Sequence, residues 1–255
     1  MHSYPIMIQK TISALEFTPH NLGGPWECWR LAKFTNHFNL PWSEVALPHC
    51  WNATDCVDPD AVYHEGAGWY RTHLELDSPY ANGRVGLHFE GTGQRAVVYI
   101  HTTEVGRHSG GYDEWTVDIT EACEAYRAEY GDGPIPLAIR CDNTRDLETI
   151  PSDVSDFNLY GGIYRPMHLV YRPAVDWADI RLEPVLKGES AELSVHAALD
   201  SFVSGESVEL RLELLNTKGE AVAQHEEAIE IWQGERSLVT WQIEAPELWH
   251  PDHPA

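Results

Sequence analysis

The chain has 255 residues, of which 43% are hydrophobic and 22% are charged, and its formal net charge at pH 7 is −23. This composition is typical of a globular protein, and the negative field disfavours nucleic acid and anionic membrane surfaces as partners. Its apolar runs are only a few residues long, too short for a membrane span. The opening residues, MHSYPIMIQKTIS, lack the basic start and apolar core of a secretory signal, so we expect a cytoplasmic location.

Five cysteines are present, an odd number, and no two of them are spaced as Cys-x-x-Cys. The pattern indicates neither a disulfide framework nor a zinc site, and reduced thiols are the expectation for a cytosolic chain. A bridge between Cys50 and Cys56 across a loop is the alternative. The sequence shows no phosphate loop, nucleotide fingerprint or Ser-His-Asp arrangement, so we predict no cofactor and no metal.

Up to residue 173, apolar and polar residues alternate with a period of two, as in half-buried β-strands. Turn residues such as Asn82-Gly83 separate the alternating segments. The predicted strands are 69–76, 84–90, 96–101, 114–119, 136–142 and 165–171, and a single helix is predicted at 120–130. Short strands at this spacing are typical of an all-β sandwich.

The pattern changes at Pro173, which predicts a domain boundary at 173–176. Further strands are predicted at 177–184, 191–200, 207–216 and 237–245. The segment SVELRLELL alternates strictly, and the turn LNTKGE after it predicts a hairpin. One face of that strand carries Val208, Leu210, Leu212 and Leu214. These features are typical of an immunoglobulin-like β-sandwich.

Such a sandwich needs about seven strands, and five or six are predicted after residue 176. The final segment, PELWHPDHPA, follows a strand that ends near Ala245. A sheet that stopped there would keep an open edge, which folded proteins usually cover. We therefore expect the second domain to be truncated and the chain to be a piece of a longer protein.

The segment DFNLYGGIYRP, residues 156–166, places Asp156 and Asn158 directly before a Gly-Gly pair. Short carboxylate and amide side chains can hydrogen-bond the neighbouring hydroxyls of a sugar. They also form Asx turns, and local chemistry favours that structural interpretation. A second candidate is the long loop 52–67, where Asn52 and Asp55 follow a tryptophan. Asp142-Asn143 is predicted to satisfy backbone groups at the end of a strand.

Several segments in series resemble motifs of glycoside hydrolase family 2, which contains β-galactosidases, β-glucuronidases and β-mannosidases. The matching segments run in the family's order over residues 25 to 255. They are LPHCWNATD (47–55), GWYRTHLEL (68–76), FEGTGQRAVVYIHTTEVGRHSGGYDEWTVDIT (89–120), LAIRCDNT (137–144), DFNLYGGIYR (156–165) and PELWHPDHPA (246–255).

The resemblance implies a jelly-roll, galactose-binding-like sugar-binding domain over residues 1–173 and an immunoglobulin-like domain over 174–255. The (β/α)₈ barrel that follows in the family, with its two catalytic glutamates, has no counterpart here, so we predict that the chain alone is inactive. In family members the aspartate matching Asp156 contacts the glycone sugar. Asn158 belongs to the same motif, and Asn52 and Asp55 lie in a segment that resembles the lining of the subsite.

The resemblance favours the N-terminal, non-catalytic portion of a retaining β-glycosidase, with β-galactosidase as the expected activity of the parent protein. The implied partners are a β-glycoside or oligosaccharide, a catalytic barrel in cis or on a second chain, and further copies in a homo-oligomer. The jelly roll and the ten tryptophans keep a stand-alone carbohydrate-binding module open as an alternative. A third hypothesis is the small subunit of a two-chain glycosidase.

Overall fold

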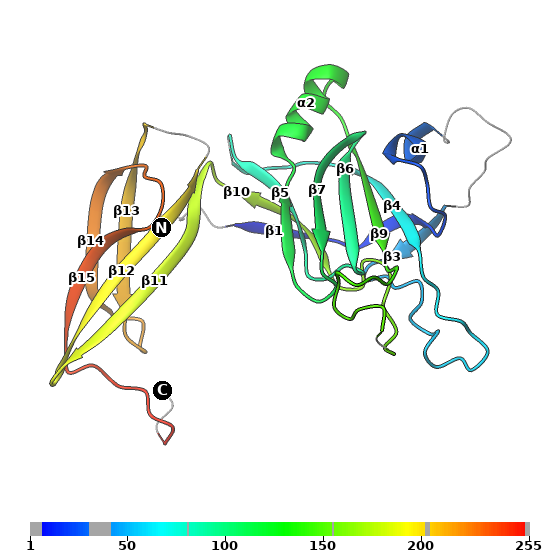
Figure 1. Ribbon diagram of the computed structural model, residues 1–255. Helices are drawn as coiled ribbons and strands as arrows, with labels where there is room; N and C mark the ends of the chain where they lie inside the picture. The colour runs from blue at the N-terminus through cyan, green and yellow to red at the C-terminus, as the bar shows by residue number, and fades with distance from the viewer. Residues whose placement is uncertain (1–6, 31–41, 81, 155, 202–204, 253–255) are drawn as a thin grey trace. The chain divides into compact units, whose positions relative to one another are not determined.

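The computed structural model describes residues 7–30, 42–80, 82–154, 156–201 and 205–252 (Figure 1). The chain divides into two compact units, a first unit of Ile6–Arg172 and a second unit of Pro173–Ala255. Strands dominate both units, which confirms the prediction of an all-β fold. In the described part of the chain, neither helix is long and apolar enough to cross a bilayer.

The first unit consists of two antiparallel sheets with a shared core. The smaller sheet has the order β1-β10-β5-β8 and the larger one β3-β2-β4-β9-β6-β7. The smaller sheet contains β1 (Ile8–Ile12), β10 (Met167–Arg172), β5 (Arg84–Phe89) and β8 (Trp115–Asp118). The larger sheet contains β3 (Ser43–Ala46), β2 (Ala14–Thr18), β4 (Ala67–Leu74), β9 (Ile135–Asp142), β6 (Arg95–Ile100) and β7 (Thr103–Ser109).

One hydrophobic core joins the facing sides of these sheets. Leu87 and Leu169 contribute from the smaller sheet, and Tyr70, Val98 and Leu137 from the larger one. All six strands predicted for this region exist, and so does the predicted helix, α2 (Thr120–Tyr130). The structure adds a short helix, α1 (Pro25–Arg30), and the strands β1, β2, β3 and β7, which the sequence pattern did not indicate.

The second unit has a three-stranded sheet of order β11-β12-β15 and a two-stranded sheet of β13 and β14. Their bounds are β11 (Val175–Lys187), β12 (Ser190–Ser201), β13 (Ser207–Leu215), β14 (Ala221–Glu230) and β15 (Arg236–Glu244). The predicted hairpin exists, since β13 and β14 pair antiparallel through the turn at 216–220. On β13 the burial alternates with the residues, as the strict sequence alternation predicts.

All five cysteines are free thiols, so the alternative of a bridge between Cys50 and Cys56 is wrong. Burial raises the pKa of the Cys28 and Cys123 thiols from 9.0 to about 12. Burial also raises the pKa of Cys141, which is fully enclosed in the core of the first unit. Cys56 is exposed.

We predict that a thiol reagent labels Cys56 rapidly and reaches Cys28, Cys123 and Cys141 only when the chain unfolds, because the thiolate is the reactive form. Labelling kinetics at about pH 8, with and without urea, measure this. The native thiols keep their protons to a higher pH than the unfolded ones. Their contribution to stability is therefore complete below pH 9.0 and is lost as the pH rises towards about 12. If the reagent rapidly labels more than one cysteine of the folded Cys56→Ser variant, the burial of Cys28, Cys123 and Cys141 is contradicted.

Candidate functional site

The candidate loops 47–66 and 143–163 meet at one end of the first unit, where the buried side chain of Asn52 joins them. Asn52 Nδ2 donates to the carbonyl of Leu159 at 2.8 Å and to that of His64 at 3.4 Å. Its Oδ1 accepts from the Gly161 amide at 2.9 Å. Asn52 is 0% exposed, so these bonds form in a low-dielectric setting where an unpaired amide would be costly.

Asn143, at the end of β9, repeats this arrangement from the other side. Its Nδ2 donates to the same two carbonyls, at 2.8 Å to Leu159 and at 2.9 Å to His64. Its Oδ1 accepts from the amide of Gly66 at 2.9 Å. Asn143 is also 0% exposed. The prediction that this position satisfies backbone groups is confirmed, and we refer to Asn52 and Asn143 together as the asparagine clasp.

The Gly161-Gly162 corner lies directly against aromatic side chains. A Cβ on Gly161 would stand 2.1 Å from the ring of Trp51, and one on Gly162 would stand 2.4 Å from the Tyr70 hydroxyl. Gly162 also has a φ of 110°, which favours glycine. The backbone amide of Trp51 donates to the Gly161 carbonyl at 3.2 Å. Two glycines are therefore required because the Trp51 ring and the Tyr70 hydroxyl lie too close to the backbone here for a Cβ.

Tyr70 on β4 is hydrogen-bonded to residues on both sides of the place where the Gly161-Gly162 corner and the 47–66 loop meet. Its hydroxyl lies 2.8 Å from His49 Nδ1 and accepts from the Ile163 amide at 3.4 Å. Burial raises the pKa of Tyr70 well above its ordinary value and lowers the pKa of His49. Both groups are thus held in their neutral forms, as a hydrogen-bonded support of the loop requires.

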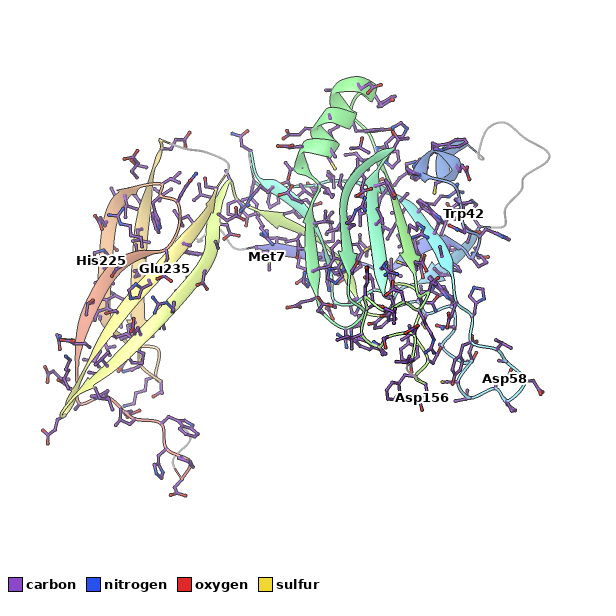
Figure 2. The ribbon with its side chains drawn as sticks, in the orientation of Figure 1. Met7, Trp42, Asp58, Asp156, His225 and Glu235 are labelled. Atoms are coloured by element: carbon purple, nitrogen blue, oxygen red, sulfur yellow. The ribbon has the colours of Figure 1, made fainter. Side chains whose placement is uncertain are left out.

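Asp156 is exposed, on the loop that the clasp secures. Figure 2 shows Asp156 and Asp58 at the tips of two loops at the same end of the first unit. The neighbouring backbone is held by Arg145, whose guanidinium donates to the Phe157 carbonyl and to Glu65 Oε1. The Asp156 carboxylate is therefore available to an external ligand, while the backbone of the next residue, Phe157, is anchored by Arg145.

The other three predicted residues have partners within the protein. Asn158 is half-buried, and its Oδ1 accepts from Asn52 Nδ2 at 3.2 Å. Asp55 is half-buried, and its Oδ2 accepts from the His64 amide at 2.8 Å. Asn52 is predicted to contact a sugar, and in the structure its amide is buried and bonded to the backbone of Leu159, His64 and Gly161. The structure thus brings Asn52 and Asn158 together, and leaves Asp156 as the exposed member of the set.

The loop that carries Asp156 also carries exposed apolar side chains, a feature that sequence reasoning missed. The exposed ones are Leu147, Ile150, Val154 and Phe157. Exposed apolar groups that gather on one loop mark an interaction surface more often than single scattered ones do. Their signal in the sequence was weak, because they are spaced irregularly in a segment without a strand or helix period. In the described residues, no cluster of three His, Cys, Asp or Glu side chains could hold a metal ion.

We predict that Asn52→Ala and Asn143→Ala each lower the free energy of unfolding by about 1–3 kcal/mol, because each leaves buried backbone groups unpaired. The double variant should lose more than the sum of the two, because only there do the buried carbonyls of His64 and Leu159 lose both of their donors. Urea unfolding of the four proteins in the cycle measures the coupling. Asp156→Asn is the control and should stay within about 0.5 kcal/mol of the parent. Strict additivity would show that the two asparagines act independently.

Gly161→Ala should destabilise the first unit by about 1–3 kcal/mol through overpacking against Trp51. Gly133→Ala is a matched control, because a Cβ at Gly133 would meet nothing within 4 Å. Thermal and urea unfolding of both variants measure the difference. Equal stability of the two variants would mean that the tryptophan ring moves aside at no cost.

No family model matches the chain. A putative β-glucuronidase from Formosa agariphila is 30% identical over 243 residues, which are 93% of this chain and 28% of that protein. A β-galactosidase from Thermoanaerobacter pseudethanolicus is 30% identical over 82% of this chain and 28% of its own length.

Among solved structures, a β-glucuronidase from Parabacteroides merdae is 41% identical, with a TM-score of 0.83 over 95% of this chain and 31% of that one. The chain thus spans less than a third of the length of each of these three proteins. Its fold matches that of the Parabacteroides merdae enzyme over 95% of its length. The chain therefore belongs to glycoside hydrolase family 2.

Proposed function

We propose that this chain is the non-catalytic portion of a retaining β-glycosidase and that it supplies a glycone contact through Asp156. The observation that carries the proposal is an exposed carboxylate at the matched motif position, on a loop secured by two fully buried asparagines. A group held in this way is preorganised, so a ligand does not have to order the loop when it binds.

The chemistry of hydrolysis would come from elsewhere in the parent protein. A retaining glycosidase needs two carboxyl groups about 5–5.5 Å apart, one as acid/base and one as nucleophile. In our proposal a (β/α)₈ barrel, in cis or on a second chain, provides that pair. The exposed Val154 and Phe157 beside Asp156 would be covered by the barrel mouth. Asp156 would then accept hydrogen bonds from sugar hydroxyls, and these bonds are stronger when water is excluded.

The substrate class that we propose is a β-glucuronide, with a β-galactoside as the alternative. Two of the three relatives described above are named β-glucuronidases, including the one that is 41% identical, which moves our proposal away from the β-galactosidase favoured by the motifs alone. Five free thiols support a reducing, cytoplasmic compartment. Assembly into a homo-oligomer also remains part of the proposal.

The test compares the 255-residue chain with the longer enzyme that contains it. We expect the chain alone to hydrolyse neither 4-nitrophenyl β-glucuronide nor the β-galactoside. In the longer enzyme, Asp156→Ala should lower kcat/KM about 10- to 100-fold, as expected for the loss of a charged hydrogen bond worth about 1.5–3 kcal/mol. Steady-state kinetics on both substrates also identify the preferred glycone.

Asp153→Ala is the matched control, because Asp153 is exposed on the same loop and should leave kcat/KM within about twofold of the parent. An equal loss in both variants would argue against a specific glycone contact by Asp156. Turnover by the chain alone would contradict the non-catalytic assignment. Tight sugar binding by the chain alone would instead support a stand-alone carbohydrate-binding module.

A further inference from the structure

The segment that carries Asp156 is a loop that is closed at its base by charged side chains. The loop begins at Asp146, shortly after the end of β9. It comes back at Phe157, whose carbonyl accepts a hydrogen bond from the guanidinium of Arg145. We call residues 146–154 and 156–157 the Asp156 loop. Compact surface loops whose two ends are held together in this way are frequently functional.

The start of the Asp156 loop is fixed by groups other than Arg145. The carboxylate of Asp146 forms an ion pair with Arg95 of β6. Its Oδ1 also accepts from the amides of Glu148 at 2.8 Å and Thr149 at 3.0 Å. The carbonyl of the same residue accepts from the Asp153 amide at 3.0 Å. The first half of the loop is therefore attached to the larger sheet and folded on itself.

The end of the loop, next to Asp156, is held by Arg145. The guanidinium donates from Nη2 to the Phe157 carbonyl and from Nε to Glu65 Oε1, the latter at 2.7 Å. Glu65 directly follows His64, whose carbonyl accepts from both members of the asparagine clasp. A planar guanidinium can serve two acceptors in a fixed geometry. One side chain thereby ties the end of the Asp156 loop to the second candidate loop.

The hydrogen bonds of Arg145 differ from those of the clasp in their access to water. The side chain of Glu65 is 36% exposed, and Phe157 is 67% exposed. Water can replace a lost donor at such positions, and surface ion pairs contribute little to the free energy of unfolding. The main consequence of the contact is therefore geometric, because it sets the direction of the backbone one residue after Asp156.

We propose that Arg145, oriented by Glu65, is a positioning residue for the carboxylate of Asp156. This inference rests on the proposed function, since Arg145 can affect the reaction in this way only if Asp156 contacts the sugar. With Arg145 in place, the backbone beside Asp156 is ordered before a ligand arrives. Without it, the ligand has to order that backbone when it binds, and the cost appears in KM.

Kinetics of the longer enzyme test the coupling between the two residues. Arg145→Ala should raise KM for the preferred 4-nitrophenyl glycoside about tenfold and leave kcat within about twofold, because ordering is needed equally in the ground and transition states. In the Asp156→Ala background the same change should alter kcat/KM less than about twofold, because the group to be positioned is absent. A merely structural residue would lower kcat/KM by the same factor in both backgrounds.

Two further measurements separate positioning from stability. Arg145→Lys retains the charge and can donate to either partner but not to both in the same geometry, so its KM should lie between those of the parent and of Arg145→Ala. The urea midpoint of Arg145→Ala should shift less than that of Asn52→Ala, because the contacts of Arg145 lie at the surface and those of Asn52 are buried.

Order parameters of the backbone amides, measured by NMR on the 255-residue chain, provide a readout that does not depend on activity. In Arg145→Ala the order parameters of residues 156–158 should fall from about 0.85 to below about 0.6, the range of flexible backbone. The amides of Glu148 and Thr149 are the internal control. They should keep their order, because Asp146 still accepts their hydrogen bonds.

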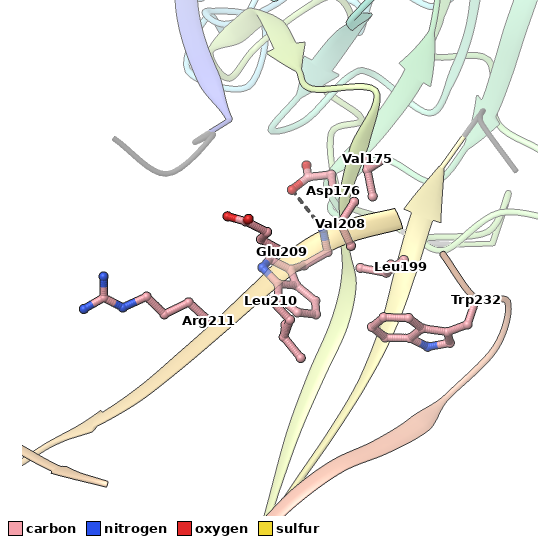
Figure 3. A pocket seen from close by; sticks show the side chains of 9 residues that line it. Val175, Asp176, Leu199, Val208, Glu209, Leu210, Arg211 and Trp232 are labelled. Atoms are coloured by element: carbon pink, nitrogen blue, oxygen red, sulfur yellow. Dashed lines mark hydrogen bonds between the residues drawn. The ribbon is translucent and has the colours of Figure 1, made fainter. Parts of the chain in front are cut away.

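Arg211→Ala is the matched control for the loss of a paired arginine. Its guanidinium also contacts two partners, Glu213 and Glu226, but in the second unit. Figure 3 shows the Arg211 side chain pointing away from the cavity of that unit, which Trp232 lines. This variant should leave KM within about twofold of the parent and the order of residues 156–158 unchanged.

The outcomes distinguish this inference from the function on which it rests. Parent-like kinetics of Arg145→Ala beside a strongly impaired Asp156→Ala would overturn the positioning role and leave the sugar contact intact. Equal losses from Arg145→Ala in the two backgrounds would also overturn it, as would unchanged order at residues 156–158. Parent-like kinetics of Asp156→Ala would instead overturn the proposed function, and the positioning role with it.

Discussion

The asparagine clasp is the interaction on which the candidate site depends. Asn52 and Asn143 come from loops far apart in the sequence, yet their amides donate to the same carbonyls, those of His64 and Leu159. Each carbonyl has two lone pairs, so one acceptor can serve both asparagines. The segments that contain Asn52, Asn143 and Leu159 are thereby held together inside the first unit. If either amide were removed, water could not easily replace it, because both residues are fully buried.

The clasp explains the chemistry of the segment beside it. Once Leu159 is fixed, the chain must turn over the Trp51 ring, and there is no room for a Cβ at Gly161. The Gly161-Gly162 corner is therefore explained by packing and not by capping of the Asp156 side chain. The close approach of Gly161 to Trp51 sets the path of the chain, and Asp156 lies on the outer part of that path, exposed to solvent. The polar residues of this region thus differ in burial. Asn52 and Asn143 are buried structural amides, and Asp156 is an accessible carboxylate.

The central strands could be predicted from the sequence because they are rich in apolar residues, which either alternate with polar ones or form short continuous runs. The β9 strand is mostly buried and was found, as was β5, in which burial alternates more clearly. The strands β1, β2, β3 and β7 were missed. Three of them, β1, β3 and β7, form edges of their sheets and are mostly exposed, so selection for an apolar face is weak there. β2 lies between β3 and β4 and buries alternate side chains, but it has only five residues. The role of Asn52 could not be predicted for a different reason: a sequence pattern shows that a residue is polar, but not whether its partners are a ligand or the backbone of a loop 100 residues away.

The two units differ in how completely they bury their own apolar surface. The first unit encloses a continuous core that includes Tyr70, Phe89 and Leu137 at 0% exposure. In the second unit, Leu182 and Leu186 of β11 remain more than half exposed. Since apolar burial is the main favourable term in folding, these side chains of β11 stabilise the second unit less than the buried side chains of the central strands stabilise the first. The clasp, in contrast, lies entirely within the first unit. The path of the Asp156 loop therefore depends on contacts within the first unit alone.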